Sequence, residues 1–221
     1  MPVSPEVSEI LRRIARYVKI AFASVKPVYY LEGLARGIGV HDIPLIGENG
    51  AVIYLPEKNE EFVFDDVNLA AKNELSILRD ELYKRLYNKC WFQPNRVIVT
   101  AFPKGNFTIQ ETKKEFKDVI RNHGLKNIKL HVNIDSVECI PEGVDKGWGI
   151  NQLQNILNIP ECEITAVGNS DNDIPMFIKA DLSICVGNKQ NIKEIANKTF
   201  ETGIEALKFI AFSSIDDFTR K

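Results

Sequence analysis

The chain has 221 residues, a formal net charge of −2 and 44% hydrophobic residues. This length accommodates a core domain and a smaller second domain, and the small net charge argues against a protein that binds nucleic acid. No apolar stretch is long enough to span a membrane and the amino end lacks an apolar signal segment, so we expect a cytoplasmic protein without a membrane partner.

The first 55 residues alternate between helical and extended patterns. Apolar residues at helical spacing follow Ser4, which can cap a helix. The predicted elements are, in order, a helix capped by Ser4, a strand Val18–Ala23, a helix from Pro27 to about Gly37, and short strands Ile43–Ile46 and Ala51–Leu55 around a turn at Gly47–Gly50.

A charged stretch, Glu57–Glu61, separates this segment from a second one with longer helices. The second segment is expected to contain a strand Phe62–Phe64, a helix of about Leu69–Tyr87, a strand Arg96–Ala101, a helix Gln110–Asn122 that ends at Gly124, and strands Ile128–Asn133 and Val137–Ile140. The turn Pro141–Gly143 then marks a return to the first domain.

The remaining residues again alternate between strand and helix. Their predicted elements are a helix that begins near Asp145, strands Ile164–Val167 and Leu182–Val186, and helices near Ile192–Ala196 and Ile204–Phe212. Alternation of this kind is typical of parallel sheets. We therefore predict an α/β fold with a Rossmann-like parallel-sheet core, residues 1–55 and 142–221, interrupted by a mixed α/β domain of about residues 56–141.

The loop Gly168–Met176 follows the apolar run Ile164–Val167 and precedes a segment that can start a helix. It therefore gathers several side-chain oxygens at the carboxyl end of a strand, where open α/β sheets bind ligands. Such oxygens suit Mg²⁺, which keeps several water ligands for a phosphate-bearing substrate. The same residue types also form turns and cap helices without any metal, so both interpretations stay open for this loop alone.

Two further positions favour a phosphate site. Lys146 opens a predicted helix, where a cation is electrostatically unfavourable unless an anion lies beside it. Ser24 follows the predicted strand Val18–Ala23, so its hydroxyl is a candidate phosphate ligand. Each residue also has a simpler interpretation when it is taken alone. Lys146 can be a solvated surface lysine, and Ser24 can be the N-cap of the next helix.

These segments together resemble the haloacid dehalogenase (HAD) superfamily of phosphatases, in its sugar-phosphatase and archaeal phosphoglycolate-phosphatase branch, whose members carry a large inserted cap domain. Four motifs carry the resemblance. Ser24-Val25-Lys26-Pro27 stands where the family usually has Thr-Gly-Arg-Pro, Gly47–Ala51 matches its Glu-Asn-Gly-Ala turn, Asp145-Lys146-Gly147 matches its lysine segment, and Gly168–Met176 matches its acidic loop, Gly-Asp-x-x-Asn-Asp-x-x-Met. The predicted domain of residues 56–141 corresponds to the cap.

The resemblance implies roles for these residues. Lys146 and Ser24 would be the catalytic residues that remain, and phosphate or substrate would be bound by Ser24, Val25, Asn49 and Lys146. Asn169 and Asp173 would hold Mg²⁺, and the substrate would be a small phosphorylated metabolite. A homo-oligomer is possible in such a family.

The chain departs from the family at two places. The family's nucleophile lies in an Asp-x-Asp-Gly motif on a first strand, and this sequence contains no such motif. Asn169 stands where the family has a metal-binding aspartate, so Mg²⁺ affinity should be lower. Two functions therefore stay open: an Mg²⁺-dependent phosphomonoesterase by family, without its nucleophile in the chain as given, or a catalytically inactive HAD-fold binding or interaction protein that retains a phosphate pocket.

The absent first strand has a consequence for the sheet. In the family it lies between the strand that ends at Ser24 and the strand that ends at Gly168. Buried backbone groups left without partners cost about 1–3 kcal/mol each. We therefore expect that these two strands pair directly, or that another segment, from this chain or a partner, fills the position between them. The remaining alternative is that the natural chain is longer than the one given.

Overall fold

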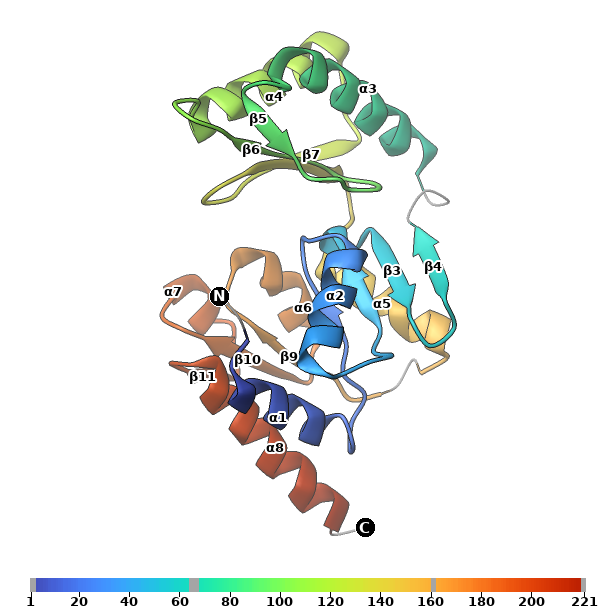
Figure 1. The fold of residues 1–221 in the computed structure, drawn as a ribbon, viewed down its shortest axis with the longest axis vertical. Coiled ribbons are helices and arrows are strands. Elements are labelled where there is room, and N and C mark those ends of the chain that lie inside the picture. The colour runs from blue at the N-terminus through green and yellow to red at the C-terminus, as the bar shows by residue number, and fades with distance from the viewer. Residues whose placement is uncertain (1–2, 64–67, 160–161, 220–221) are drawn as a thin grey trace. The chain divides into compact units, whose positions relative to one another are not determined.

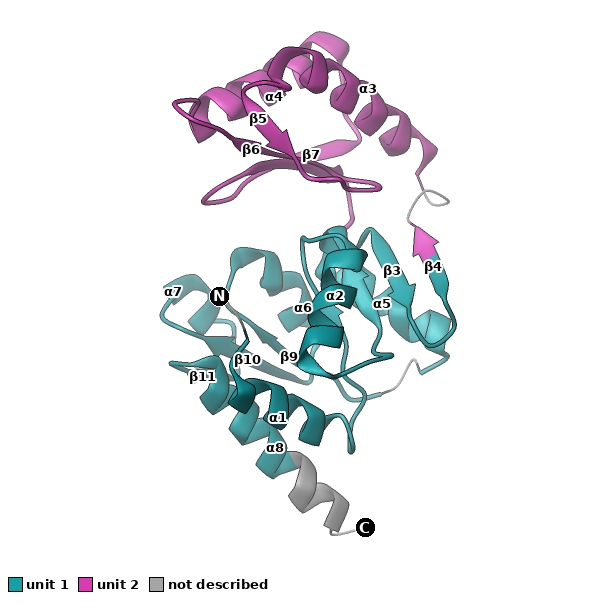
Figure 2. Ribbon diagram, viewed as in Figure 1, with its two compact units in different colours: residues 1–61, 145–221 teal, residues 62–144 magenta. Residues whose placement is uncertain are grey.

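A computed structural model describes residues 3–63, 68–159 and 162–219, and the side chains of residues 214–219 are not described. The chain divides into two compact units (Figure 2). The core unit is residues 1–61 with 145–221, and the inserted unit is residues 62–144. The sequence placed the corresponding limits at residues 56 and 141. In the described part of the chain, no helix is both long enough and apolar enough to cross a membrane.

The core unit contains two separate sheets (Figure 1). The first has the strand order β1-β2-β3-β4, and the second has the order β11-β10-β9. Their bounds are β1 (Phe22–Ala23), β2 (Leu45–Gly47), β3 (Val52–Leu55), β4 (Glu60–Val63), β9 (Thr165–Gly168), β10 (Leu182–Val186) and β11 (Lys198–Phe200). The last two residues of β4 belong to the inserted unit. β1 pairs in parallel with β2, and β9, β10 and β11 are parallel throughout. With the alternating helices, these parallel strands confirm the predicted α/β fold class.

The first strand is shorter than the sequence predicted. The sequence predicted Val18–Ala23 as a strand, but β1 contains only Phe22 and Ala23. Among the described residues β1 pairs with one strand, β2, with Phe22 opposite Leu45, and this pairing covers only two residues. Of the alternatives expected for the gap between the two strands, direct pairing of β1 with β9 is absent from the described residues, since each is an edge strand of its own sheet. A segment supplied by a partner stays a prediction.

Packed helices link the two sheets of the core unit. α5 contacts β2 and β3 of the first sheet and also α6, which contacts β9 and β10 of the second. α1 contacts both α2, which lies on β2 and β3, and α8, which lies on β10 and β11. The bounds are α1 (Pro5–Ile14), α2 (Val28–Ile38), α5 (Lys146–Leu157), α6 (Ile174–Lys179), α7 (Gln190–Lys193) and α8 (Gly203–Thr219), with 3₁₀ turns η1 (Glu48–Gly50) and η3 (Asp171–Asp173).

The inserted unit is an antiparallel sheet with two helices packed against it. The strand order is β5-β6-β8-β7, and α3 and α4 contact each other and the same strands, β6, β7 and β8. The bounds are α3 (Leu69–Leu86), β5 (Cys90–Phe92), β6 (Val99–Pro103), α4 (Ile109–His123), β7 (Ile128–Val132) and β8 (Val137–Pro141). The sequence missed β5, and Phe64, the last residue of the predicted strand Phe62–Phe64, lies outside the described residues.

Candidate phosphate site of the core unit

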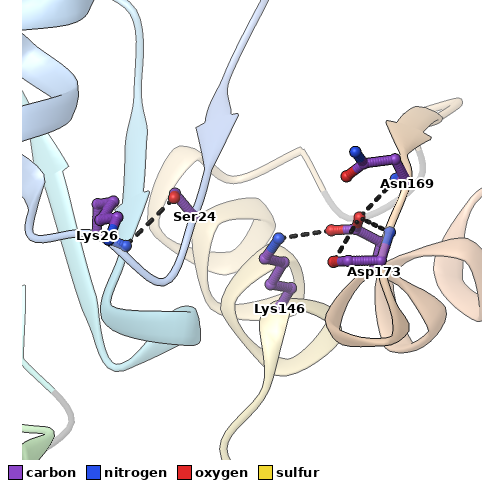
Figure 3. A network of polar contacts seen from close by, with 6 residues as sticks. Ser24, Lys26, Lys146, Asn169 and Asp173 are labelled. Atoms are coloured by element: carbon purple, nitrogen blue, oxygen red, sulfur yellow. Dashed lines mark hydrogen bonds and ion pairs between the residues drawn. The ribbon is translucent and has the colours of Figure 1, made fainter. Parts of the chain in front are cut away.

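Three loops of the core unit bring the predicted site residues together. Ser24 follows β1, Asn169 follows β9, and Lys146 is the first residue of α5. α5 contacts both η1, which holds Asn49, and η3, which holds Asp173. Figure 3 shows Lys146 between Ser24 on one side and Asn169 and Asp173 on the other.

Lys146 and Asp173 form a buried ion pair. Nζ of Lys146 lies 2.5 Å from Oδ1 of Asp173, and the two residues are 7% and 3% exposed. They stand 27 residues apart in the sequence. The lysine that the sequence marked as misplaced at a helix start therefore has an anionic partner inside the protein.

The second carboxylate oxygen of Asp173 organises the loop before it. Oδ2 accepts hydrogen bonds from the backbone N–H groups of Asn169 and Ser170, each at 2.8 Å, and from the Ser170 hydroxyl at 3.0 Å. Burial raises the pKa of Asp173, but the Lys146 ammonium and these donors lower it more, so the pKa lies below its ordinary value. Asp173 is therefore a carboxylate whose oxygens already have four partners.

Ser24 and the turn Gly47–Gly50 are joined by backbone hydrogen bonds. Asn49 N–H donates to the Ser24 carbonyl at 3.0 Å, and the Ser24 hydroxyl accepts from Lys26 N–H at 3.2 Å. Val25, the other predicted phosphate-binding residue of this segment, lies in the half-buried bend between Ser24 and Lys26.

Asn49 itself is in an unusual conformation. Its φ is 59°, in the left-handed region, and that of Glu48 before it is 51°. Strain of this kind is typical of ligand-binding sites. Asn49 is 3% exposed, and among the described residues none donates a hydrogen bond to its Oδ1. A buried acceptor without a donor favours a ligand with an N–H or O–H group at this position.

The described residues alone do not make an Mg²⁺ site. They contain no group of three His, Cys, Asp or Glu side chains that could hold a metal ion. Of the predicted ligands, Asp173 is engaged by Lys146 and its own loop, and Asn169 offers an uncharged oxygen. The neighbouring Asp171 is paired with Lys189, at 2.6 Å. The Mg²⁺ site at Asn169 and Asp173 stays a prediction.

A cavity that the sequence did not indicate lies elsewhere in the core unit. Its volume is about 410 Å³, and none of the predicted site residues lines it. The lining residues come from the α1–β1 and α2–β2 connections, the β3–β4 turn and the end of α5. All the charged side chains around it are exposed, so no ligand chemistry stands out.

Solved structures share this architecture of an α/β core with an inserted α/β unit. A Thermoplasma acidophilum protein aligns with a TM-score of 0.73 at 17% identity, covering 96% of this chain and 90% of its own. A subclass IIB sugar phosphatase of the HAD superfamily aligns with a TM-score of 0.65 at 15% identity. The alignment covers 96% of this chain and 92% of that protein.

Sequence comparison gives the same result. Residues 106–205 match the family of haloacid dehalogenase-like hydrolases. Phosphoglycolate phosphatase 2 of Saccharolobus solfataricus is 26% identical over 196 residues, 88% of this chain and 76% of that protein. The phosphoglycolate phosphatase of Archaeoglobus fulgidus is 26% identical over 208 residues, which make up 91% of this chain and 86% of that protein. In sequence and in fold, the chain is therefore similar to phosphatases of the HAD superfamily.

Proposed function

We propose that the core unit binds the phosphoryl group of a small phosphorylated metabolite, with Ser24, Val25, Asn49 and Lys146 as its ligands. The observation that carries the proposal is the buried ammonium of Lys146 at the start of α5, a helix of 12 residues. A cation and the positive end of a helix dipole together attract an anion. Lys146 has three N–H donors, and among the described residues only Asp173 accepts from its ammonium.

The relatives support a small phosphorylated acid as the ligand. The phosphatases of Saccharolobus solfataricus and Archaeoglobus fulgidus are named for phosphoglycolate. A phosphate monoester of a small hydroxycarboxylic acid would place its phosphoryl oxygens at Lys146 and the hydroxyl of Ser24. A protonated phosphate oxygen would also supply the O–H donor that Oδ1 of Asn49 lacks.

We further propose that the chain as given binds this ligand without hydrolysing it. The family mechanism needs an aspartate that attacks phosphorus, and the sequence contains no Asp-x-Asp-Gly motif. Asp173 does not replace it, because both of its oxygens are engaged. The alternative is a phosphomonoesterase with an unrecognised nucleophile, and its support is the similarity of the chain to phosphatases.

The binding proposal is tested by calorimetric titration with 2-phosphoglycolate. Lys146→Met should weaken binding by about tenfold or more, because a charge-assisted contact is lost. The matched control is Lys208→Met, which removes a lysine from an exposed ion pair with Glu6, 2.7 Å long, and should leave the affinity unchanged. Equal losses in the two variants, or no binding by the wild type, would contradict the proposal.

The proposal on activity is tested with p-nitrophenyl phosphate and Mg²⁺. We expect no turnover above background, since removal of a covalent nucleophile costs several orders of magnitude in rate. Turnover that Asp173→Ala abolishes would show that this chain has another nucleophile or activates water directly.

A further inference from the structure

Asn169 is a polar residue of the candidate site whose side-chain amide has no hydrogen-bond partner among the described residues. It is the first residue after β9, and its backbone N–H donates to Oδ2 of Asp173 at 2.8 Å. This contact fixes the position of the residue, while its side chain stays exposed. In Figure 3 the side-chain amide extends to the side on which Lys146 and Ser24 lie. Asn169 is therefore placed to contact a ligand.

The residue type at this position decides which ligand can be contacted directly. The side-chain amide of Asn169 has two N–H donors and one acceptor oxygen, whereas an ionised carboxylate has acceptor oxygens only. The oxygens of a phosphate monoester also accept, and they carry negative charge. Asn169 can therefore donate to phosphate directly, whereas an aspartate at the same position would need a cation between its oxygens and those of the phosphate.

Asp173, the neighbouring carboxylate, is poorly suited to hold Mg²⁺ in this loop. Its Oδ1 lies 2.5 Å from Nζ of Lys146, and its Oδ2 accepts from three donors of Asn169 and Ser170. A divalent cation at Oδ1 would lie beside the ammonium, and like charges at such short range repel. Moving Lys146 away to admit the metal would leave its buried charge without a partner. Lys146 and Mg²⁺ therefore compete for the same carboxylate.

The charges of the predicted site residues balance without a metal ion. Lys146 and Asp173 form an ion pair, and the side chains of Ser24, Asn49 and Asn169 are uncharged. A phosphate group beside these residues would meet an ammonium and neutral donors. Among these residues, no unpaired carboxylate requires a metal ion to neutralise it before phosphate can bind.

From these contacts we infer that Asn169 binds a phosphate oxygen through its side-chain N–H groups, so that the site holds a phosphate monoester without Mg²⁺. The inference rests on the proposed function and adds Asn169 to its phosphate ligands. It gives Asn169 a different role from the metal ligand that the sequence predicted. The two roles predict different effects of Mg²⁺ on binding, so one measurement separates them.

The first experiment titrates the full chain with 2-phosphoglycolate in a calorimeter, once with EDTA and once with excess Mg²⁺. The two dissociation constants should differ by less than about twofold. Binding that requires Mg²⁺, or that Mg²⁺ strengthens by about tenfold or more, would overturn the inference and leave the proposed function standing. No binding under either condition would contradict the proposed function itself, and the inference with it.

The second experiment compares two substitutions that add the same negative charge to the core unit. In EDTA, Asn169→Asp should weaken binding by about tenfold or more, because the new carboxylate repels phosphate and has no N–H to donate. Excess Mg²⁺ should recover at least part of this loss, since the cation can bridge the carboxylate and the phosphate oxygens. The matched control is Asn155→Asp, at an exposed position in the last turn of α5. It should change the affinity by less than about twofold under both conditions.

A third variant, Asn169→Ala, separates the hydrogen bond from the charge. In EDTA it should weaken binding by about threefold or more, because a hydrogen bond to a charged oxygen is lost. Full affinity of Asn169→Ala, or equal affinities of Asn169→Asp and Asn155→Asp, would show that the side-chain amide does not contact phosphate. Thermal unfolding checks that each variant is folded. If Asn169→Asp does not fold, the wild-type titrations and Asn169→Ala decide.

Discussion

The ion pair of Lys146 and Asp173 fixes the geometry of the candidate site at the level of single residues. Taking two charges out of water costs several kcal/mol for each ion, and the pair offsets this only while both partners are present. Loss of one partner leaves an uncompensated buried charge, at a cost of about 3–5 kcal/mol. The three donors on Oδ2 of Asp173 add to the pair, so the start of α5 and the loop after β9 are held together by one carboxylate.

The depressed pKa of Asp173 predicts how this carboxylate contributes to stability. A folded-state pKa below the ordinary value of 3.8 stabilises the folded protein above that pH, and this stabilisation is lost as the pH falls through the folded pKa. The difference in unfolding free energy between wild type and Asp173→Asn should be constant from about pH 7 to pH 5 and should shrink below about pH 4. Urea unfolding at a series of pH values measures it.

The control for this prediction is Asp171→Asn. The pKa of Asp171 is also lowered, first by its hydrogen bond from Lys189, but this pair is exposed and screened by solvent. Its substitution should change the unfolding free energy by less than about 1 kcal/mol at any pH. An Asp173→Asn difference that does not depend on pH would show that the carboxylate contributes through packing and not through charge.

The sequence alone predicted part of this residue-level detail. The misplaced charge of Lys146 and the oxygen-rich loop at Gly168–Met176 were visible, because both depend on local patterns. The direct bond between Lys146 and Asp173 was not, because it joins residues 27 positions apart through tertiary packing. The engaged state of Asp173 also could not be predicted, since it depends on donors that only the folded loop supplies.

At the level of elements, glycines allow α5 to pack closely against its neighbours. A Cβ on Gly147 would lie 2.5 Å from the Pro175 carbonyl oxygen at the start of α6, and one on Gly149 would lie 2.7 Å from Cγ2 of Ile46. Gly50, with φ of 106°, lies so close to the Asp145 carbonyl that no side chain fits. The helix can therefore approach its neighbours, and Lys146 can reach Asp173, because these positions have no side chains.

This packing predicts opposite effects for two glycine substitutions. Gly147→Ala should destabilise the protein, because the contact with the Pro175 backbone can be relieved only by moving α5 away from α6. Gly33→Ala, in the middle of α2, meets nothing within 4 Å and should stabilise by about 0.5–1 kcal/mol, the usual gain for this change in a helix. Thermal unfolding of both variants measures the effects, and stabilisation by Gly147→Ala would contradict this account of α5.

The sequence predicted long elements better than short ones. The helices of the inserted unit were found because their apolar periodicity extends over several turns, and the end of the second helix is visible as Gly124. β5 was missed because three residues, Cys90–Phe92, are too few to show an alternating pattern. The length of β1 was overestimated because an apolar run indicates burial, whereas a strand also needs a partner to pair with.

At the level of the whole molecule, the two units are built differently. The core unit is assembled from two distant segments of the chain, whereas the inserted unit is one continuous segment, residues 62–144. The inserted unit also has its own core, in which the buried face of α3 packs with residues of α4 and the sheet. This core contains Leu75, Leu78, Leu82, Leu86, Val99, Phe116 and Val119, each at most 2% exposed. A continuous segment with its own core meets the usual conditions for independent folding.

We therefore predict that residues 62–144, expressed alone, fold and unfold cooperatively. Urea unfolding followed by circular dichroism should give a single transition. Leu78→Ala in the fragment should lower the unfolding free energy by about 2–5 kcal/mol, because Leu78 is fully buried. Thr108→Ala should cost only about 1 kcal/mol, since it removes the cap of α4, where the Thr108 hydroxyl accepts from Glu111 N–H at 3.2 Å. A fragment that unfolds gradually, with no effect of Leu78→Ala, would show instead that the inserted unit needs the core unit to fold.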